Sequence, residues 1–548
     1  MEPIFTDKQL NNMSREDLIS LMKIVQEQTK KKDTEIQLLK DKQKELEFLN
    51  AMLSDRLTLA QRKQFGASSE KYAEGYEQMN LFNEAEASAD AETEELFEEI
   101  RPSSYKRKKR KGKKEEDLSN FETVETRTYK LEGEARYCPE CGKKYNVVTK
   151  EIVKRLRFVP AKFAVEEEIT YVYSCPKCGS MKRPEKEPSL IRGSIATPSL
   201  VAGIMNAKYV NGMPLARQER EFARYDLDLS TKTMANWIIN CADRYLKPLY
   251  QLMKEELLES RYIHCDESRI QVLGEPEQKG TTQNWMWVYL TDEFSGSPQM
   301  VLFDYERTRA GYHPVNFLGN RFHGYLTCDG YQAYHSLGEG IIISGCLTHA
   351  RRRFDAALTA LKKDFTKEQL KETVAYQAMS RIGILYKIEE MLHDKTPEEK
   401  YEERQKQSRP VMDAMFEWLH TMEDSVDRSS LIGDAILYTL NQEVYLRRYL
   451  EDGHLSIDNN SAERALKNFA VGRRNWLFAK SVRGADASAL VYSITETALL
   501  NNLKPYAYLT YILDELRKMG AFPKEEELKK LLPWSEYLPE YCRTKLKK

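Results

Sequence analysis

The chain has 548 residues, 31% of them charged, and its 84 basic and 85 acidic side chains leave a net charge of -1. This length predicts several domains, and the balanced charge leaves the choice of partner to local clusters. No stretch approaches the roughly 20 apolar residues of a membrane span, and no secretory signal marks the N-terminus, so we expect a cytoplasmic protein.

Residues 1–65 are predicted to form a long helix. No Pro or Gly lies between Pro3 and Gly66, and a seven-residue repeat is mostly apolar. Its positions are Leu18, Val25, Lys32, Leu39, Leu46 and Leu53. The repeat favours a coiled coil, and hence self-association, over a lone amphipathic helix.

Residues 66–120 have the composition of a charged linker. An acidic tract, EAEASADAETEELFEE, precedes a basic one, KRKKRKGKK. Such polar, low-complexity segments bury too little apolar surface to form a core. The basic tract could bind phosphates without sequence preference, or the two tracts could simply balance each other.

Residues 121–195 contain two Cys-x-x-Cys pairs among the nine cysteines of the chain. Cys138 and Cys141 form the first pair, and Cys175 and Cys178 the second. Two such pairs supply the four thiolates of a structural zinc site, which leaves no position open for water. The alternating segment KFAVEEEITYVYS between them predicts one strand of a zinc ribbon.

Residues 196–258 are helical in pattern. A helix, a short polar break and a second helix beginning near Ser230 are expected, with Ser230 as the N-cap. The pair could be a helix-turn-helix that binds DNA or a plain helical hairpin.

From residue 261 the pattern becomes that of strands. RYIHCDESRIQVL, NWMWVYLTD and QMVLFDYE are β-type runs separated by turn residues. A mixed, partly helical stretch leads to GYLTCDGYQAY and GIIISGCLTHARRRF, which predict a fourth strand and then either a strand or a strand-helix unit. Residues 361–455 have long helical patterns, and apolar residues within 462–470 mark one face of a further helix.

This order suggests a ribonuclease H-like core. Asp266 would lie on the first strand, Asp329 at the end of the fourth, and Glu463 on the late helix. Three acids from distant segments are enough to hold Mg2+ ions for phosphoryl transfer. The basic residues that follow Glu463 would then contact DNA phosphates.

Two of these acids have simpler explanations. Asn460 and Glu463 have the spacing of a capping box, and Glu463 and Lys467 that of a helical ion pair. Asp329 precedes Gly330 and could begin a turn.

The first acid is also ambiguous. Glu267 follows Asp266 and would point to the opposite face of the strand, so the sequence alone does not choose between them. Asp304, near the end of another predicted strand, is a further candidate.

Several segments resemble the transposases of the insertion-sequence-66 family. They are HCDES, TCDGYQAY, GCLTHARRRF and IDNNSAERALKNFAVGRRNWLFAKS. The resemblance extends to QFGASSEK, to both Cys-x-x-Cys pairs and to TETALLNNLKPYAYLTYIL, so it covers most of the chain.

The resemblance implies a DDE transposase with Asp266, Asp329 and Glu463 as catalytic ligands of Mg2+ or Mn2+. It sets aside Glu267 and Asp304. The motif HCDES ends in serine where threonine is usual. In this fold the core comprises residues 259–360 and 456–500, with residues 361–455 as a helical insertion and residues 501–548 as a C-terminal helical region.

The expected architecture is therefore multidomain α+β. It comprises the coiled-coil helix, the four-cysteine zinc-ribbon-like module, a helical DNA-binding region and the interrupted ribonuclease H-like α/β core. Cys346 and His349 resemble a Cys-x-x-His signature of several DDE superfamilies, although a buried strand-end pair is an equal alternative.

The implied partner is double-stranded DNA, both the terminal inverted repeats of the element and the target. The candidate backbone contacts are Arg351, Arg352, Arg353, Arg464, Lys467, Arg473 and Arg474. Element-encoded accessory proteins are a further expectation for such a family. The alternatives are a ribonuclease H-like nuclease that only hydrolyses DNA, and an inactive zinc-containing DNA-binding regulator.

Overall fold

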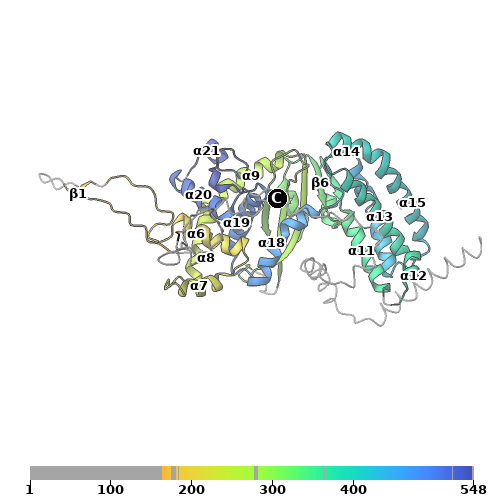
Figure 1. Cartoon of the computed structure of the whole chain (residues 1–548), viewed down its shortest axis with the longest axis horizontal. Coiled ribbons are helices and arrows are strands. Elements are labelled where there is room, and N and C mark those ends of the chain that lie inside the picture. Colours follow the sequence, from red (N-terminus) through yellow and green to blue (C-terminus); the bar gives the residue numbers. More distant parts are fainter. Residues whose placement is uncertain are drawn as a thin grey trace, which may run out of the picture. The chain divides into compact units, whose positions relative to one another are not determined.

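The computed structural model describes residues 143, 163–174, 181–182, 184–276, 282–362, 364–520 and 522–545. The described residues divide into two units, a smaller one up to residue 185 and a larger one from residue 186 (Figure 1). The predicted coiled coil, the linker and the four paired cysteines lie outside the described residues. No helix of the described ranges is both long and apolar enough to span a bilayer.

In the smaller unit, a short antiparallel pair flanks the second Cys-x-x-Cys. Strand β1 (Tyr173–Ser174) pairs with β2 (Met181–Lys182), with Tyr173 opposite Lys182. The long strand predicted from residue 162 is wrong, because residues 163–172 have no regular structure. Val165 and Ile169 are exposed there, and no described strand pairs with the segment to bury them.

The larger unit is built on a mixed sheet of five strands in the order β5-β4-β3-β6-β7. The strands are β3 (Tyr262–Gln271), β4 (Gln283–Leu290), β5 (Val301–Glu306), β6 (Gly324–Cys328) and β7 (Ile341–Gly345). Strand β4 runs antiparallel to both β3 and β5, whereas β6 runs parallel to both β3 and β7. With helix α10 (Tyr312–Leu318) between β5 and β6, the predicted order of elements is confirmed.

The register of the sheet separates neighbouring residues of β3 onto opposite faces. Asp266 lies opposite Val288, which lies opposite Phe303, so these three share one face. The row through Glu267 and Asp304 lies on the other face. A residue and its successor on a strand therefore reach different layers.

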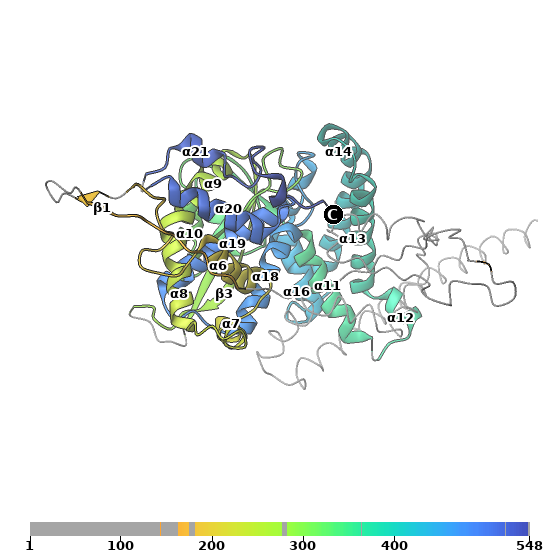
Figure 2. The same ribbon diagram turned by 60° about the vertical axis from the view of Figure 1, so that its left-hand side comes forward.

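Helices cover both faces of the sheet, which explains why its strands are apolar on both sides. On the face of Asp266, helices α18 (Asn460–Trp476) and α19 (Val482–Leu500) pack, and the ring of Phe303 lies 6.2 Å from Phe469 and 5.5 Å from Tyr492. The opposite face is covered by α9 (Lys247–Glu259) and α10 (Figure 2). There the ring of Tyr289 stacks on that of Phe317, with 3.7 Å between the ring centres.

The remaining helices of this part of the chain lie before the sheet and after α19. They are α6 (Pro198–Met205), η3 (Asn206–Val210), α7 (Leu215–Ala223), α8 (Thr231–Cys241), η4 (Ala242–Leu246), α20 (Pro505–Lys518), α21 (Glu525–Lys529) and η8 (Glu540–Cys542). Ser230 caps α8 as predicted, because its hydroxyl accepts a hydrogen bond from the N–H of Thr233 at 3.2 Å. Whether α7 and α8 bind DNA stays a prediction.

The segment between β7 and α18 is helical, as its sequence indicates, and has a hydrophobic core of its own. Its elements are α11 (Leu347–Leu361), α12 (Lys367–Glu372), α13 (Val374–Met391), α14 (Pro397–Glu403), η6 (Arg404–Ser408), α15 (Arg409–Glu423), α16 (Leu431–Asn441), α17 (Glu443–Leu446) and η7 (Arg448–Leu450). The core includes Phe354, Ile382 and Phe416. Arg448 joins this block to the sheet edge by donating to the carbonyl of Ile343 at 2.7 Å.

Close packing of α18 on α19 depends on Gly472. A Cβ atom at this position would overlap the ring of Trp476 and the hydroxyl of Tyr492. Gly383, on an exposed face of α13, has open space where its Cβ would be. Both glycines are helical, but only Gly472 has neighbouring side-chain atoms where a Cβ would lie.

We expect Gly472→Ala to destabilise the core by about 1–3 kcal/mol through overpacking. Gly383→Ala, the matched control, should be neutral or stabilising by about 0.4–1 kcal/mol because alanine restricts the unfolded chain. The midpoint of urea unfolding measures both changes. Equal shifts in the two variants would contradict the proposed contact.

Candidate functional site

The three predicted acids come from three elements that meet on one side of the sheet. Asp266 lies within β3, Asp329 directly follows β6, and Glu463 is in the first turn of α18. Strands β3 and β6 are parallel neighbours with His264 opposite Thr327, and continuing this register puts Asp329 level with Asp266. Helix α18 covers the face to which Asp266 points.

Asp266 is half-buried and lies among negative charges. Its pKa is raised well above the ordinary value, first by burial and then by the carboxylates of Glu267, Asp329 and, more weakly, Glu463. The hydrogen bond that its Oδ1 accepts from the N–H of Glu267, at 2.8 Å, acts in the opposite direction. The structure thus brings the first predicted acid within electrostatic reach of the other two.

Glu267 is held on the opposite face by cationic and polar partners. Its Oε1 accepts from Nε and Nη2 of Arg309, at 2.6 and 2.5 Å, and the hydroxyl of Tyr334 donates to Oε2. Only 1% of the side chain is exposed. Burial and the charge of Asp329 raise its pKa, and Arg309 opposes that shift. Glu267 is therefore already engaged in a buried ion pair.

Asp329 sits in a tight turn, as its sequence allows. Its Oδ1 accepts from the N–H of Tyr331 at 2.9 Å, and its Oδ2 lies 4.0 Å from Nη2 of Arg309. The guanidinium of Arg309, which rests 3.8 Å from the centre of the Tyr331 ring, therefore lies between Glu267 and Asp329. No sequence pattern marked Arg309 as a site residue, although a buried Glu267 requires such a cation.

Glu463 has two cationic neighbours from α11. Nη2 of Arg352 donates to Oε2, and Nε2 of His349 lies 3.5 Å from Oε1. Burial raises the pKa of Glu463, but His349 and Arg352 outweigh it and leave the pKa below its ordinary value. The carboxylate is 20% exposed and faces these side chains.

The alternative capping box is wrong. The N-cap of α18 is Asn459, and Asn460 is the first helical residue. The amide of Asn460 donates to Asp458 at 2.7 Å, while Asn459 is turned inward to β3, as its bond of 2.8 Å to the carbonyl of Cys265 shows. Neither asparagine side chain caps the helix.

The Cys-x-x-His pair also contacts this region. Cys346 is buried at the N-cap of α11, and its Sγ accepts from the N–H of Asn459 at 3.1 Å. His349, one turn later, faces Glu463. Both residues therefore contact the start of α18, and a catalytic role for either stays a prediction.

Several candidate DNA contacts already have protein partners. Arg352 binds Glu463, and Arg353 binds Asp434. Arg473 donates to the hydroxyl of Ser268 at 3.2 Å and to the carbonyl of Arg269. Arg464 bonds to the hydroxyl of Ser461 at 3.0 Å, and Arg351 lies 5.4 Å from the ring of Tyr386. Their contribution to DNA binding stays a prediction.

The donor chemistry of the site suits a hard divalent cation. Mg2+ prefers carboxylate oxygens and retains water. Oε1 of Glu463 is buried without a hydrogen-bond partner, and a cation would offset the repulsion around Asp266. Within the described ranges, however, no three His, Cys, Asp or Glu side chains stand close enough to share an ion. In the structure Arg352 occupies Glu463, and a metal-binding role for the three acids stays a prediction.

Comparison with known families identifies the chain. The family model described as "Transposase IS66 family" matches residues 193–487, which is more than half of the chain. The chain belongs to this transposase family. The resemblance found in the sequence is thus confirmed, and the family implies DNA as the partner and catalysis with divalent metal ions.

Three further family models match other parts of this transposase. The "IS66 C-terminal element" matches residues 493–534, and the "zinc-finger binding domain of transposase IS66" matches residues 135–179, which include all four paired cysteines. The model "Transposase C of IS166 homeodomain" matches residues 52–120, most of which we predicted to be a linker. A zinc-finger domain fits the predicted zinc module.

Relatives of the transposase in Sinorhizobium fredii strain NGR234 carry no assigned function. The uncharacterized protein y4hP is 30% identical over 412 residues, 72% of this chain and 73% of the relative. The uncharacterized protein y4jD is 29% identical over 418 residues, 74% of this chain and 79% of the relative.

Asp304, the competing acid, occupies a different environment from Asp266. It lies in the row of Glu267, and burial raises its pKa to about 6, with Lys254 opposing and Asp486 adding to the shift. Asp292, beyond the end of β4, is also buried, but His264 outweighs burial and lowers its pKa. The two carboxyls therefore have opposite effects on the pH dependence of stability.

We expect Asp304→Asn to stabilise the transposase above pH 6. The folded wild type binds the proton of Asp304 more tightly than the unfolded chain, so its stability falls as pH rises from 3.8 to about 6. Asn removes this loss. Asp292→Asn should destabilise at neutral pH, with a difference that shrinks in acid. Urea midpoints between pH 4 and 8 measure both, and a shared sign at pH 7 would refute the assignment.

Proposed function

We propose that this transposase cleaves the ends of its own mobile element and joins them to target DNA, with Asp266, Asp329 and Glu463 as ligands of divalent metal ions. The observation that supports the proposal is that Asp329, after β6, and Glu463, at the start of α18, both act electrostatically on Asp266 in β3. The strand order also supports a ribonuclease H-like core.

The proposed chemistry consists of two phosphoryl transfers. A water oxygen attacks the phosphorus at the element end, and the broken P–O bond releases a 3′-hydroxyl. That hydroxyl then attacks a phosphodiester of the target, forming one P–O bond while the bond to the target's leaving oxygen breaks. When bound, divalent ions would activate the attacking oxygen and stabilise the leaving oxygen.

The side chains of the site would divide this work. Asp266 and Asp329, level on neighbouring strands, would hold the ions from the sheet, and Glu463 would hold them from α18. Arg309 fixes Glu267 and borders Asp329. By this proposal Cys138, Cys141, Cys175 and Cys178 hold a structural Zn2+, outside the reaction.

Other segments would recognise and pair the element ends. We assign end recognition to the zinc finger and to the helices from α6 to α9, and pairing of protomers to the coiled coil. The basic side chains beside Glu463 would contact the DNA backbone. Accessory proteins encoded by the element would be further partners of this assembly.

A strand-transfer assay with Mg2+ or Mn2+ tests the function. Asp329→Ala, Asp266→Asn and Glu463→Gln should each reduce cleavage and joining by more than the roughly 10- to 100-fold typical of losing an outer-shell partner. Asp304→Asn, the matched acidic control, should retain both steps. Cleavage without joining by the wild type would instead indicate a nuclease, and DNA binding without chemistry a regulator.

Arg352 blocks Glu463 in the structure, so the proposed metal site predicts an exchange. Arg352 is half exposed, at 50%, and its guanidinium could transfer to a DNA phosphate when Glu463 takes a cation. The same arginine would then oppose metal binding without DNA and favour DNA binding with metal.

We expect Arg352→Ala to bind Mn2+ more tightly than the wild type in the absence of DNA, because the carboxylate of Glu463 is released. Its DNA affinity should fall, with the salt dependence of binding lower by about one unit. Paramagnetic resonance and salt-dependent DNA titrations measure these effects. Weaker Mn2+ binding by Arg352→Ala, with Arg464→Ala unchanged, would rule out the exchange.

A further inference from the structure

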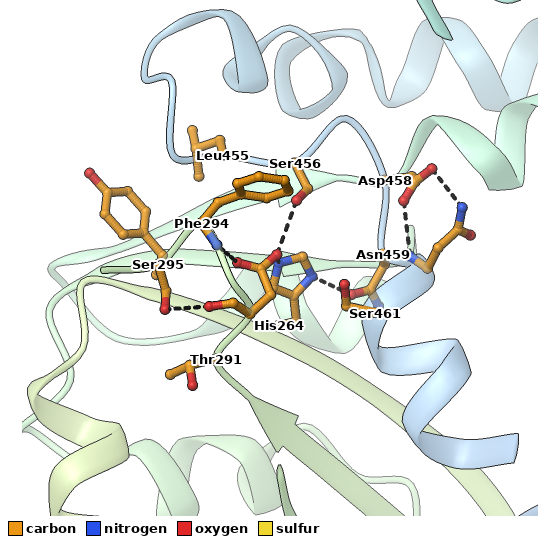
Figure 3. A network of polar contacts seen from close by, with 12 residues as sticks. His264, Thr291, Phe294, Ser295, Leu455, Ser456, Asp458, Asn459 and Ser461 are labelled. Atoms are coloured by element: carbon orange, nitrogen blue, oxygen red, sulfur yellow. Dashed lines mark hydrogen bonds and ion pairs between the residues drawn. The ribbon is translucent and has the colours of Figure 1, made fainter. Parts of the chain in front are cut away.

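A buried polar network joins the strand that carries Asp266 to the segment that carries Glu463 (Figure 3). His264 lies two residues before Asp266 on β3, so both point to the same face. Asn459 is the N-cap of α18 and lies one helical turn before Glu463. The network therefore connects the two segments directly beside the two acids.

The hydrogen bonds define the orientation of each group. Nδ2 of Asn459 donates to the carbonyl of Cys265 at 2.8 Å, so its Oδ1 is the atom that faces Nδ1 of His264, 3.0 Å away. That nitrogen must carry a hydrogen. Nε2 of His264 lies 2.9 Å from Oδ2 of Asp292, so it donates as well. His264 with both nitrogens protonated is a cation.

Asp292 is in turn fixed from two sides. Its Oδ1 accepts from the N–H of Phe294 at 3.0 Å, and its Oδ2 accepts from the hydroxyl of Ser456 at 3.1 Å. Ser456 belongs to the segment that leads into α18, as Figure 3 shows. The side chains of His264 and Asp292 are 5% and 8% exposed, so the pair lies almost entirely out of water.

The charges are matched within this network. A buried ion pair contributes little net stability compared with apolar residues of the same size. Such a pair instead fixes the relative positions of its two groups, because neither can shift without leaving a buried charge unpaired.

We propose that His264, Asp292 and Asn459 are positioning residues that set the separation between the carboxylates of Asp266 and Glu463. The proposal rests on the proposed function of these acids as metal ligands. Rotation of α18 by one residue would turn Glu463 by about 100° around the helix axis. The anchored Asn459 prevents this rotation at the end of the helix where Glu463 lies.

The neighbouring asparagine provides a matched control. Asn460 carries the same amide, but it bonds to Asp458 and lies near Thr348 instead of β3. Loss of either amide removes side-chain hydrogen bonds from the start of α18, yet only Asn459 links that start to the strand of Asp266. A merely structural role predicts similar effects for both.

The test measures Mn2+ binding to the full chain by paramagnetic resonance, without DNA, at a temperature where circular dichroism shows each variant folded. Asn459→Ala should weaken Mn2+ binding by about 10- to 100-fold, as for other outer-shell partners, and slow cleavage to a similar degree. DNA affinity should stay within about 2-fold of the wild type, because no phosphate contact is removed. Asn460→Ala should bind Mn2+ like the wild type.

Each outcome decides the proposal. Equal Mn2+ affinity in Asn459→Ala and the wild type overturns it, while the proposed function stands if Asp266→Asn loses the ion. If Mn2+ binding that depends on Asp266 is absent from the wild type but present in Arg352→Ala, the same comparison is made in that variant; if it is absent from both, both proposals fail. Should Asn459→Ala not fold, Ser456→Ala decides. Removing one hydrogen bond to Asp292 should weaken Mn2+ binding by about 2- to 5-fold, and unchanged Mn2+ binding would overturn the proposal.

Discussion

The concentration of buried carboxylates is the constraint on which the site depends. Glu267, Asp329 and Glu463 all lie within electrostatic reach of Asp266, in surroundings where like charges repel strongly. The fold compensates Glu267 with Arg309 and Glu463 with Arg352. Asp266 receives instead the backbone N–H of Glu267. The uncompensated charge is thus greatest where the proposal puts the metal ions.

The sheet separates the acids of β3, because Asp266 lies on one face of it and Glu267 on the other. Because successive residues of a strand point to opposite faces, Asp266 and Glu267 differ completely in their surroundings although they are adjacent. A slip of β3 by one residue would exchange them. Eight paired positions along β4 prevent that slip, and the ion pair of Glu267 with Arg309 adds a penalty for it.

The sequence predicted most of this fold but few of its polar contacts. Strand patterns, the helix cap at Ser230 and the three acids depend on short-range signals or on family motifs. Arg309, by contrast, lies in a loop that no periodicity marks, and it acts through residues far away along the chain. The capping box failed for a related reason: Asn459 forms its hydrogen bonds with β3, and a window around α18 does not contain that strand.

The helical block between β7 and α18 contacts the segments that carry two of these acids, Asp329 and Glu463. The hydroxyl of Tyr438, on α16, packs so closely on Gly330 that any side chain there would collide with it, and Gly330 follows Asp329. Tyr386, on α13, bonds to Thr348 at 2.7 Å, and Thr348 lies 3.3 Å from Asp458 in the segment before Glu463. Because the block has its own core, these two contacts are held rigidly relative to each other. A shift of the block against the sheet edge would therefore disturb the second and third acids together.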